Sequence, residues 1–473
     1  MRYFRPHKIS FFHYIENMKA LVPDRSTNPH LWPVRRKCTV VAICVWSTTM
    51  AAWSAGSYAS AAGPLSAKFD CSNVAVLAGI TMFTVGVAFF PMITAPVSEV
   101  YGRRWLFIGT YVLFEITTIG CALVTNLAGM LLLRFFVGTG ASSFSTMVGG
   151  LLADCFESST RGFPLALFST GTFIGTALGP LASDFIVPRW GYAWLFWMQA
   201  ILNGAGLIAV AILLPETRMS VLLRREAQRR NALSTEQEEF GESDESQKPL
   251  AQLIRTSLLR PFHFLATESI VFWFSLWITF AWSILYLFFV SIPFVFTNEH
   301  RFSQEQVGLV YSAVIVASLV SLVLTVFQDQ KFRHSTKPEA RLYSCCALSL
   351  LLPTGLFMYA FTASLHYMLP VTAIFLITLG IYSIYLAVFN YLSDAYGVYA
   401  SSALAAQSFL RNFVAGFFPL FGGAMFSNLG IARAGSILGG IALGLSFVPF
   451  VLVVYGNLIR SRSPWLVKRD ASV

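Results

Sequence analysis

Charged residues are scarce in this sequence. Only 12% of its 473 residues are charged, whereas 56% are apolar. The chain also lacks the short motifs of soluble enzyme chemistry, since it has no Walker-type phosphate loop, no His/Cys cluster at metal-ligand spacing and no nucleophile elbow. These absences argue against an enzyme and against an ATP-driven pump in this chain, and they predict neither a cofactor nor a metal. The composition is typical of a polytopic membrane protein.

The sequence also lacks signs of disulfide bonding and of a cleaved leader. Its seven cysteines show neither CxxC spacing nor a disulfide-like pattern, so we interpret them as small buried apolar residues. The N-terminus is basic but has no uninterrupted apolar core and no small-residue cleavage site. We therefore expect the first membrane span to act as its own membrane signal.

Long apolar runs dominate the rest of the chain. A bilayer core about 30 Å thick needs roughly 20 apolar residues of helix. Twelve such runs are present: 39–62, 75–97, 105–124, 128–152, 162–186, 192–214, 267–291, 306–328, 342–361, 368–392, 398–424 and 433–456. The sequence thus predicts an all-α polytopic membrane protein with 12 transmembrane helices in two six-helix halves, an arrangement typical of secondary transporters.

The breaks between these runs predict the domain organisation. We expect an N-terminal tail at 1–38, a first six-helix bundle at 39–214, a central loop at 215–266, a second bundle at 267–456 and a C-terminal tail at 457–473. The central loop is charged and poor in aromatic residues, which favours short surface helix mixed with disorder.

The distribution of lysine and arginine predicts the orientation. Alternate connections carry almost all of these residues, and the opposite set carries only Lys68, Arg189, Arg301 and Arg433. Because cytoplasmic loops are rich in lysine and arginine, we expect both termini and the central loop in the cytoplasm. The net charge of +10 is then a topology signal with an attraction to anionic lipid, and it requires no nucleic-acid partner.

A short polar motif joins the second and third runs. The stretch APVSEVYGRRW at 95–105 resembles the signature of the major facilitator superfamily, in the form found in fungal twelve-span drug:proton antiporters. Gly102 permits a tight turn, and Arg103 and Arg104 anchor the next helix at the membrane surface. The resemblance implies that Glu99 lies against the N-terminal end of the eleventh helix, near 399–401, and helps to form a cytoplasmic gate. The alternative is an ordinary loop with snorkelling arginines.

Other motifs extend this resemblance over nearly the whole chain. RFFVGTGASS places Arg134 in the fourth helix, and LADCFESSTRG provides Asp154 and Arg161 as the paired charges of the next gating motif. LPETR at 214–218 ends the sixth helix, and the segments 260–269, 337–342, 391–421 and 455–465 continue the likeness. In the fifth helix, the sequence GTFIGTALGP resembles the antiporter motif through Gly171, Gly175, Gly179 and Pro180. Glycines four residues apart leave a smooth face for close helix packing, although this spacing also occurs in other membrane helices.

Proton coupling requires an ionisable group within the membrane. All seven histidines fall in loops or at helix ends, and the first span contains no acidic residue. The candidates are Glu115, Asp184 and Arg134, and Glu268 is a further acid near the inner end of the seventh helix. Glu115 and Arg134 lie at comparable depths in adjacent helices, so we hypothesise that they form an ion pair, directly or through water. The alternative is a purely structural Glu115.

Polar and aromatic residues in several spans are candidates to line a central cavity. Arg411 lies near the middle of the eleventh helix, and together with Arg134 it indicates a cavity that tolerates neutral or anionic cargo such as a weak organic acid. The other candidates are Trp46, Trp53, Gln199, Asn203, Trp277, Tyr286, Tyr382, Tyr385, Asn390, Gln407 and Asn412. For any one of them the alternative is helix or lipid packing.

These features predict a proton-coupled exporter of small organic molecules, either xenobiotics or a specialised metabolite, that works by alternating access as a monomer. We expect it in the plasma membrane, with the vacuolar membrane as an alternative. Two other functions remain open: a selective exporter of an organic acid such as a dicarboxylate, or of a polyamine, and a non-transporting membrane sensor or scaffold with the same fold.

Overall fold

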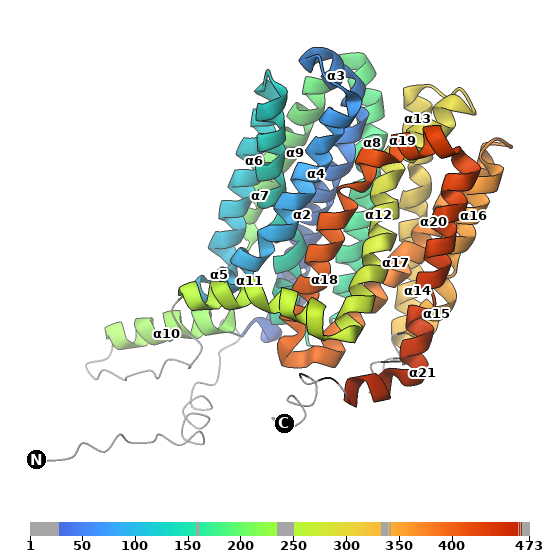
Figure 1. Cartoon of the computed structure of the whole chain (residues 1–473). Coiled ribbons are helices and arrows are strands. Elements are labelled where there is room, and N and C mark those ends of the chain that lie inside the picture. The colour runs from blue at the N-terminus through green and yellow to red at the C-terminus, as the bar shows by residue number, and fades with distance from the viewer. Residues whose placement is uncertain are drawn as a thin grey trace, which may run out of the picture.

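The computed structural model describes residues 28–157, 160–233, 250–332, 339, 342–461, 463 and 465, and over these residues it is helical and contains no strand. The predicted all-α class is therefore confirmed. The helices form two bundles that stand side by side (Figure 1). We call the end of the molecule that carries α10 and α11 the α11 face, and the opposite end, with α3 and α13, the α3 face.

The first bundle holds the helices of the N-terminal half. After the short helix η1 (Pro29–Leu31), its elements are α2 (Val34–Ser60), α3 (Ala62–Phe69), α4 (Asn73–Phe89), α5 (Pro91–Tyr101), α6 (Arg103–Leu123), α7 (Leu127–Cys155), α8 (Gly162–Trp190) and α9 (Tyr192–Leu213). The short helix α3 at the tip of the bundle was not predicted, because an eight-residue helix leaves no membrane-length apolar run.

The second bundle holds the helices of the C-terminal half. Its elements are α12 (Ser269–Asn298), α13 (Gln304–Val310), α14 (Ser312–Phe332), α15 (Tyr343–Leu348), α16 (Leu351–Thr362), α17 (Met368–Tyr396), η3 (Gly397–Tyr399), α18 (Ala400–Ala415), α19 (Phe418–Leu429), α20 (Ile431–Leu445) and α21 (Val448–Ser461). Several predicted spans are thus pairs of consecutive helices with a short break between them.

Helix length and composition agree with the predicted number of spans. Among the described residues, eleven helical segments are long and apolar enough to cross a membrane, and the bent pair α18 and α19 raises the number to 12. The two helices of that pair meet at 45°. Pro419 follows this bend, and Pro91 follows the break between α4 and α5. Proline lacks the N–H that would continue the hydrogen-bond ladder, which explains why both breaks lie there.

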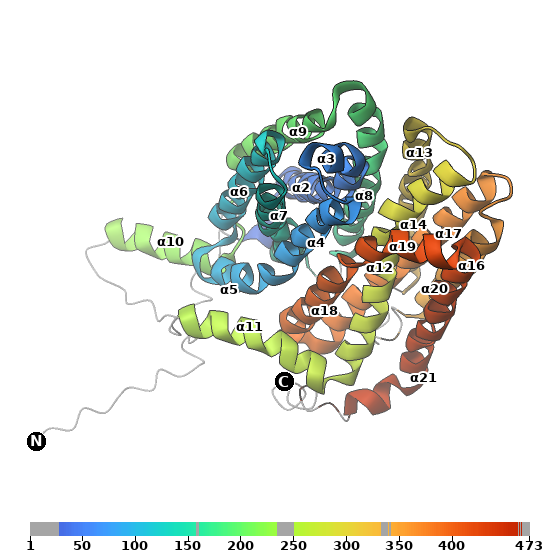
Figure 2. The ribbon, with the colours of Figure 1, turned by 45° about the horizontal axis from the view of Figure 1, so that its top comes forward.

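The connection between the two halves contains two helices, α10 (Met219–Leu233) and α11 (Leu250–Thr267). Residues 234–249, where the sequence favours disorder, lie outside the described residues. Helix α11 crosses the end of the molecule, packing against α5 of the first half and α18 of the second (Figures 1 and 2). It therefore links the two bundles on one face.

Candidate functional site

The two halves meet along their long helices, with α4 against α18, α8 against α14 and α2 against α12 (Figure 2). The hydroxyl of Thr81 in α4 donates to the carbonyl of Gly416, the residue that follows α18, at 2.7 Å. At Gly56 in α2, an added methyl group would lie 3.2 Å from the ring of Phe289 in α12. The halves are thus in direct contact across the centre.

An aromatic cluster occupies this contact. Phe173 of α8 lies with its ring centroid 5.5 Å from Trp282 of α12 and 5.2 Å from Tyr382 of α17. The Tyr382 hydroxyl hydrogen-bonds to the Thr170 hydroxyl at 2.9 Å, which ties α17 to α8. Tyr385 stacks on Trp282 within the second half, with the ring centroids 5.4 Å apart. Neither Phe173 nor Trp282 was among the predicted cavity residues.

Arg411 of α18 lies against this cluster. Its guanidinium carbon is 4.7 Å from the Trp282 ring centroid and 5.1 Å from that of Tyr385, and the residue is buried. Two of its nitrogens, Nε and Nη1, are buried without a hydrogen-bond partner among the described residues. Gln407 is also buried, with its side-chain oxygen unpaired, whereas Asn412 donates to the Ser408 carbonyl at 2.9 Å. The region thus combines aromatic surface with one unpaired cation.

Arg134 of α7 is instead held inside the N-terminal half. It donates to the carbonyls of Ser54 at 3.0 Å and Gly79 at 3.3 Å, in α2 and α4. Its guanidinium carbon also lies 4.5 Å from the Tyr58 ring and 4.8 Å from the Phe83 ring. Backbone carbonyls and aromatic faces therefore stabilise this buried cation.

The hypothesis of an ion pair between Glu115 and Arg134 is wrong. Glu115 points from α6 toward α9, where its Oε1 would lie 3.6 Å from a methyl group added to Gly204. Arg134 points toward α2 and α4. The sequence placed the two residues at similar depths in the membrane. The rotation of each helix about its axis, which depth does not determine, turns their side chains toward different neighbours.

Asp184 lies where the two halves meet at the α3 face. The side-chain amide of Gln304, at the start of α13, donates to Asp184 at 3.2 Å and to the Ser60 carbonyl at 3.2 Å. Asp184 is buried, and no ion pair joins it to a cation of the described residues. Nearby, Arg189 and Glu305 form an exposed ion pair at 3.0 Å. We call these four residues, Asp184, Arg189, Gln304 and Glu305, the α3-face latch.

Residues of the predicted gating motif form a buried charge network at the α11 face. Arg103 pairs with Asp154 of α7 at 2.5 Å. Glu216, which follows α9, accepts the backbone N–H groups of Arg103 at 3.0 Å and Arg104 at 3.2 Å. Its carboxylate thereby caps the first turn of α6, where unpaired N–H groups favour an anion. Gly102 has φ of +96°, and a side chain there would collide with the Glu216 carboxylate.

One expectation about this motif does not hold in this conformation. Glu99 is exposed and, among the described residues, forms no hydrogen bond or ion pair, so the implied contact with the start of α18 is absent from this conformation. Arg161 lies just before α8, as its N-cap residue. Glu216, not Glu99, is the buried carboxylate of the network; the LPETR segment was the sequence signal for it, but only as the end of the sixth helix.

The antiporter-motif glycines bring α8 against α2. A methyl group on Gly175 would lie 2.3 Å from the Thr49 carbonyl oxygen, and one on Gly179 would lie 2.7 Å from the Trp53 carbonyl oxygen. A methyl group on Gly171 would lie 3.0 Å from the Thr49 hydroxyl, and Pro180 packs against Gly56. The backbones of α2 and α8 approach too closely for larger residues at these positions.

Several cavity candidates lie inside one half. Gln199 and Asn203 are buried in α9, and their side-chain amides have no partner among the described residues. The half-exposed Trp46 lies beside Gly206 of α9. In the second half, Trp277 is buried and stacks on Phe274. Two further candidates remain: Trp53, buried in α2, and Tyr286, buried beside Phe289 in α12.

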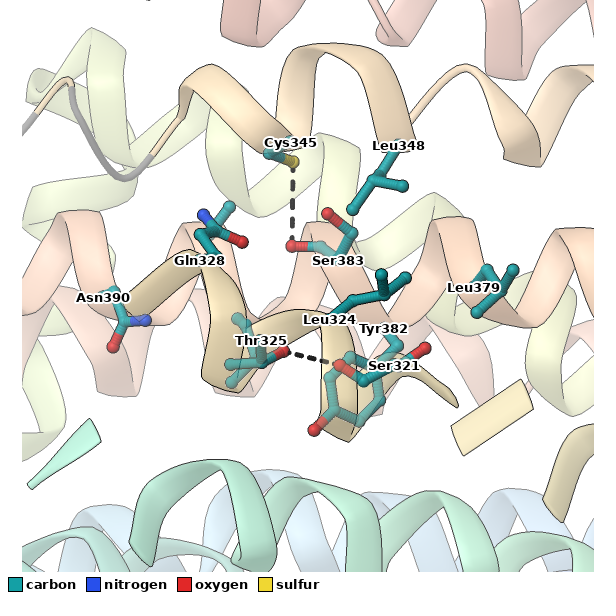
Figure 3. A pocket seen from close by; sticks show the side chains of 12 residues that line it. Ser321, Leu324, Thr325, Gln328, Cys345, Leu348, Leu379, Tyr382, Ser383 and Asn390 are labelled. Atoms are coloured by element: carbon teal, nitrogen blue, oxygen red, sulfur yellow. Dashed lines mark hydrogen bonds between the residues drawn. The ribbon is translucent and has the colours of Figure 1, made fainter. Parts of the chain in front are cut away.

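A pocket with a mixed polar and apolar lining lies within the second half, between α14, α15 and α17 (Figure 3). Tyr382 and Asn390 line it together with Ser321, Thr325 and Cys345. The thiol of Cys345 donates to the backbone carbonyl of Ser383. In Figure 3, Ser383 lies on the Cys345 side of the pocket and Tyr382 extends to the opposite side. Within the described part of the chain, no group of three or more His, Cys, Asp and Glu residues could hold a metal.

Known proteins with similar sequences are transporters. The family model described as Major Facilitator Superfamily matches residues 39–419. The chain is 30% identical to "Efflux pump FUB11" of Gibberella moniliformis over 451 residues, which cover 93% of this chain and 76% of the relative. It is 32% identical to "Major facilitator superfamily multidrug transporter mdrA" of Aspergillus fumigatus, over 94% of this chain and 75% of the relative.

Solved structures show the same fold. The proton:xylose symporter XylE superimposes with a TM-score of 0.63 at 14% sequence identity, covering 89% of this chain and 97% of that one. At this identity the likeness concerns the fold alone. With the family match, the two six-helix bundles and the membrane-length helices, the chain is a multi-pass membrane transporter of the major facilitator superfamily, in its fungal drug-efflux-like subgroup.

Proposed function

We propose that the protein exports small organic molecules from the cell in exchange for protons. The observation that carries this proposal is the aromatic cluster with the unpaired Arg411 where the two halves meet, beneath a closed α3 face. A site between two related halves is the place where such transporters bind cargo. The efflux pumps among the relatives support the outward direction.

The proposed orientation places the α11 face in the cytoplasm. Lysine and arginine concentrate in the connections on that face, while only a few lie on the other. We propose the plasma membrane as the location, because cargo then leaves the cell, and a monomer as the working unit, because each chain contains both halves of the site.

Alternating access would move the two halves about this central contact. The α3-face latch joins α8 to α13 and closes the outer side in this conformation. The charge network of Arg103, Asp154 and Glu216 lies entirely within the N-terminal half, so that half can move as a unit. Glu99 is free to meet the N-terminal end of α18 when the α11 face closes.

Asp184 is the residue we propose for proton coupling. It is buried, it lacks a cationic partner among the described residues, and it touches the opposite half through Gln304. A proton on this carboxylate would remove its charge and change its bond to Gln304, so protonation and opening of the α3 face would be linked.

An Asp184→Asn variant separates coupling from binding. We expect it to lose transport driven by a pH gradient but to retain exchange of cargo between the two sides at equal pH, because exchange requires no net proton movement. Glu305→Gln is the matched control, since it removes an exposed carboxylate from the same latch. Full gradient-driven transport by Asp184→Asn would refute the role of Asp184.

The function itself is tested by comparing metabolites inside and outside cells that lack or contain the protein. We expect one or more organic compounds to leave the cells only when the protein is present, and a protonophore to abolish this export. Accumulation of one endogenous compound in cells without the protein would identify a dedicated exporter. Unchanged metabolites and unchanged sensitivity to toxicants would contradict export and favour a sensor.

A further inference from the structure

The proposed function places Arg411 at the cargo site but does not say which group of the cargo its buried charge binds. A buried arginine normally lies beside a carboxylate or donates to several carbonyls, because an unpaired charge in a low-dielectric region is costly. Arg411 does neither within the described part of the chain, and its Nε and Nη1 atoms are both buried and unpaired. Cation–π contact with Trp282 and Tyr385 offsets only part of this cost.

We infer that Arg411 is the anion-binding group of the cargo site and that the cargo is a small organic monoanion with an aromatic or apolar body. This inference rests on the proposed export function and specifies its substrate class. A carboxylate on the guanidinium would supply the missing hydrogen-bond acceptor, and charge-assisted bonds of this kind are the strongest ones available to arginine.

The surroundings of Arg411 favour an apolar body on the anion. The rings of Trp282 and Tyr385 lie against the guanidinium, and Phe173 of the opposite half lies against both rings. Edge and face contacts with these rings would hold an aromatic or apolar group. Because Phe173 belongs to the other half, cargo bound there would touch both moving parts.

The charges also discriminate between the selective cargoes that the sequence left open. A polyamine would bring positive charge to a site that already holds an unpaired cation. A dicarboxylate would need a second cation at this contact, but Arg134 is held inside the N-terminal half by carbonyls and rings, with its Nη2 atom left unpaired among the described residues. One free guanidinium fits one negative charge.

Three probes with the same ring test this inference: 1-naphthoate, the neutral 1-naphthamide and the cationic 1-naphthylmethylammonium. Calorimetric titration of the purified full chain measures their affinities. We expect naphthoate to bind at least about tenfold more tightly than naphthamide, with the ammonium compound weakest. A hydrogen bond to a charged group typically contributes more free energy than a tenfold change in affinity requires.

Variants assign the preference to Arg411. Arg411→Gln should abolish the preference for naphthoate over naphthamide, whereas Arg411→Lys, which retains the charge, should keep a preference for the anion. Arg433→Gln is the matched control, because it removes an exposed arginine at the α3 face. Thermal unfolding of each variant shows whether it is folded.

The outcomes separate this inference from the proposed function. Equal binding of naphthoate and naphthamide, binding of none of the probes, or a preference that survives in folded Arg411→Gln would overturn the anion site. If the probes bind alike yet a pH gradient drives their movement in proteoliposomes, export stands and the substrate class falls. If naphthoate binds through Arg411 but no gradient moves it, the site stands and coupled export falls.

Discussion

Buried carboxylates in this protein have different surroundings, and these decide what each can do. Glu216 accepts backbone N–H groups at the start of α6 and is buried in the α11-face network. Glu268 accepts the hydroxyls of Tyr396 at 2.8 Å and Ser463 at 2.7 Å. Each of these two carboxylates makes its contacts within a single half, so we assign them a role in stabilising that half. Asp184 alone of these three contacts the opposite half.

Replacement of Glu216 should be strongly destabilising. Glu216→Ala leaves the N–H groups of Arg103 and Arg104 without their acceptor and removes the anion beside Gly102. The loss of charged hydrogen bonds should cost about 2 kcal/mol or more. The midpoint of thermal unfolding should therefore fall, while Glu99→Gln, at an exposed carboxylate, should leave it unchanged. Equal midpoints for the two variants would contradict this assignment.

Contacts between individual side chains were harder to predict from the sequence than the helices were. The rows of apolar residues indicated how deep Glu115 and Arg134 lie, but not which neighbour each side chain faces. The motif stretch likewise drew attention to Glu99, while the carboxylate that caps α6 comes from Glu216, more than a hundred residues later. Such contacts depend on the packing of several helices, which a single sequence does not specify.

At the scale of elements, apolar runs predicted the long helices well because the bilayer dictates their length. The run expected at 306–328 corresponds to a span at Gln304–Gln328, and that at 192–214 to Tyr192–Leu213. The short helix α3, and the division of spans into consecutive helices such as α13 and α14, escaped prediction because they depend on local turns, not on hydrophobicity.

The packing of α2 on α8 provides a prediction at this scale. Gly175→Ala places a methyl group 2.3 Å from the Thr49 carbonyl oxygen, so the helices must separate. We expect a cost of about 1–3 kcal/mol, typical of overpacking, and a lower midpoint of thermal unfolding. Gly109→Ala in α6 is the control, since a methyl group there meets nothing within 4 Å. Equal tolerance of both substitutions would show that the close approach of α2 and α8 is unimportant.

At the scale of the whole molecule, the two halves are joined at the α3 face by polar contacts that a moving transporter must break. Arg189 and Glu305 mark this junction on its exposed side. Cysteines at both positions, joined by a short reducible bis-thiosulfonate, should hold the α3 face closed.

Transport by this double variant should stop after cross-linking and recover after reduction, because cargo could no longer reach the outside. The wild type and the single Glu305→Cys variant, treated in the same way, control for the natural cysteines. Undiminished transport by a fully cross-linked protein would show that the α3 face need not open.

The central claim is that a proton gradient drives cargo across the membrane through this protein. The most direct measurement is uptake, into proteoliposomes with an acidic lumen, of the compound identified by the metabolite comparison. We predict accumulation above the external concentration, collapse of that accumulation when an ionophore removes the gradient, and none in protein-free liposomes. Equilibration to the external concentration, or equal accumulation without the protein, would contradict proton-coupled export.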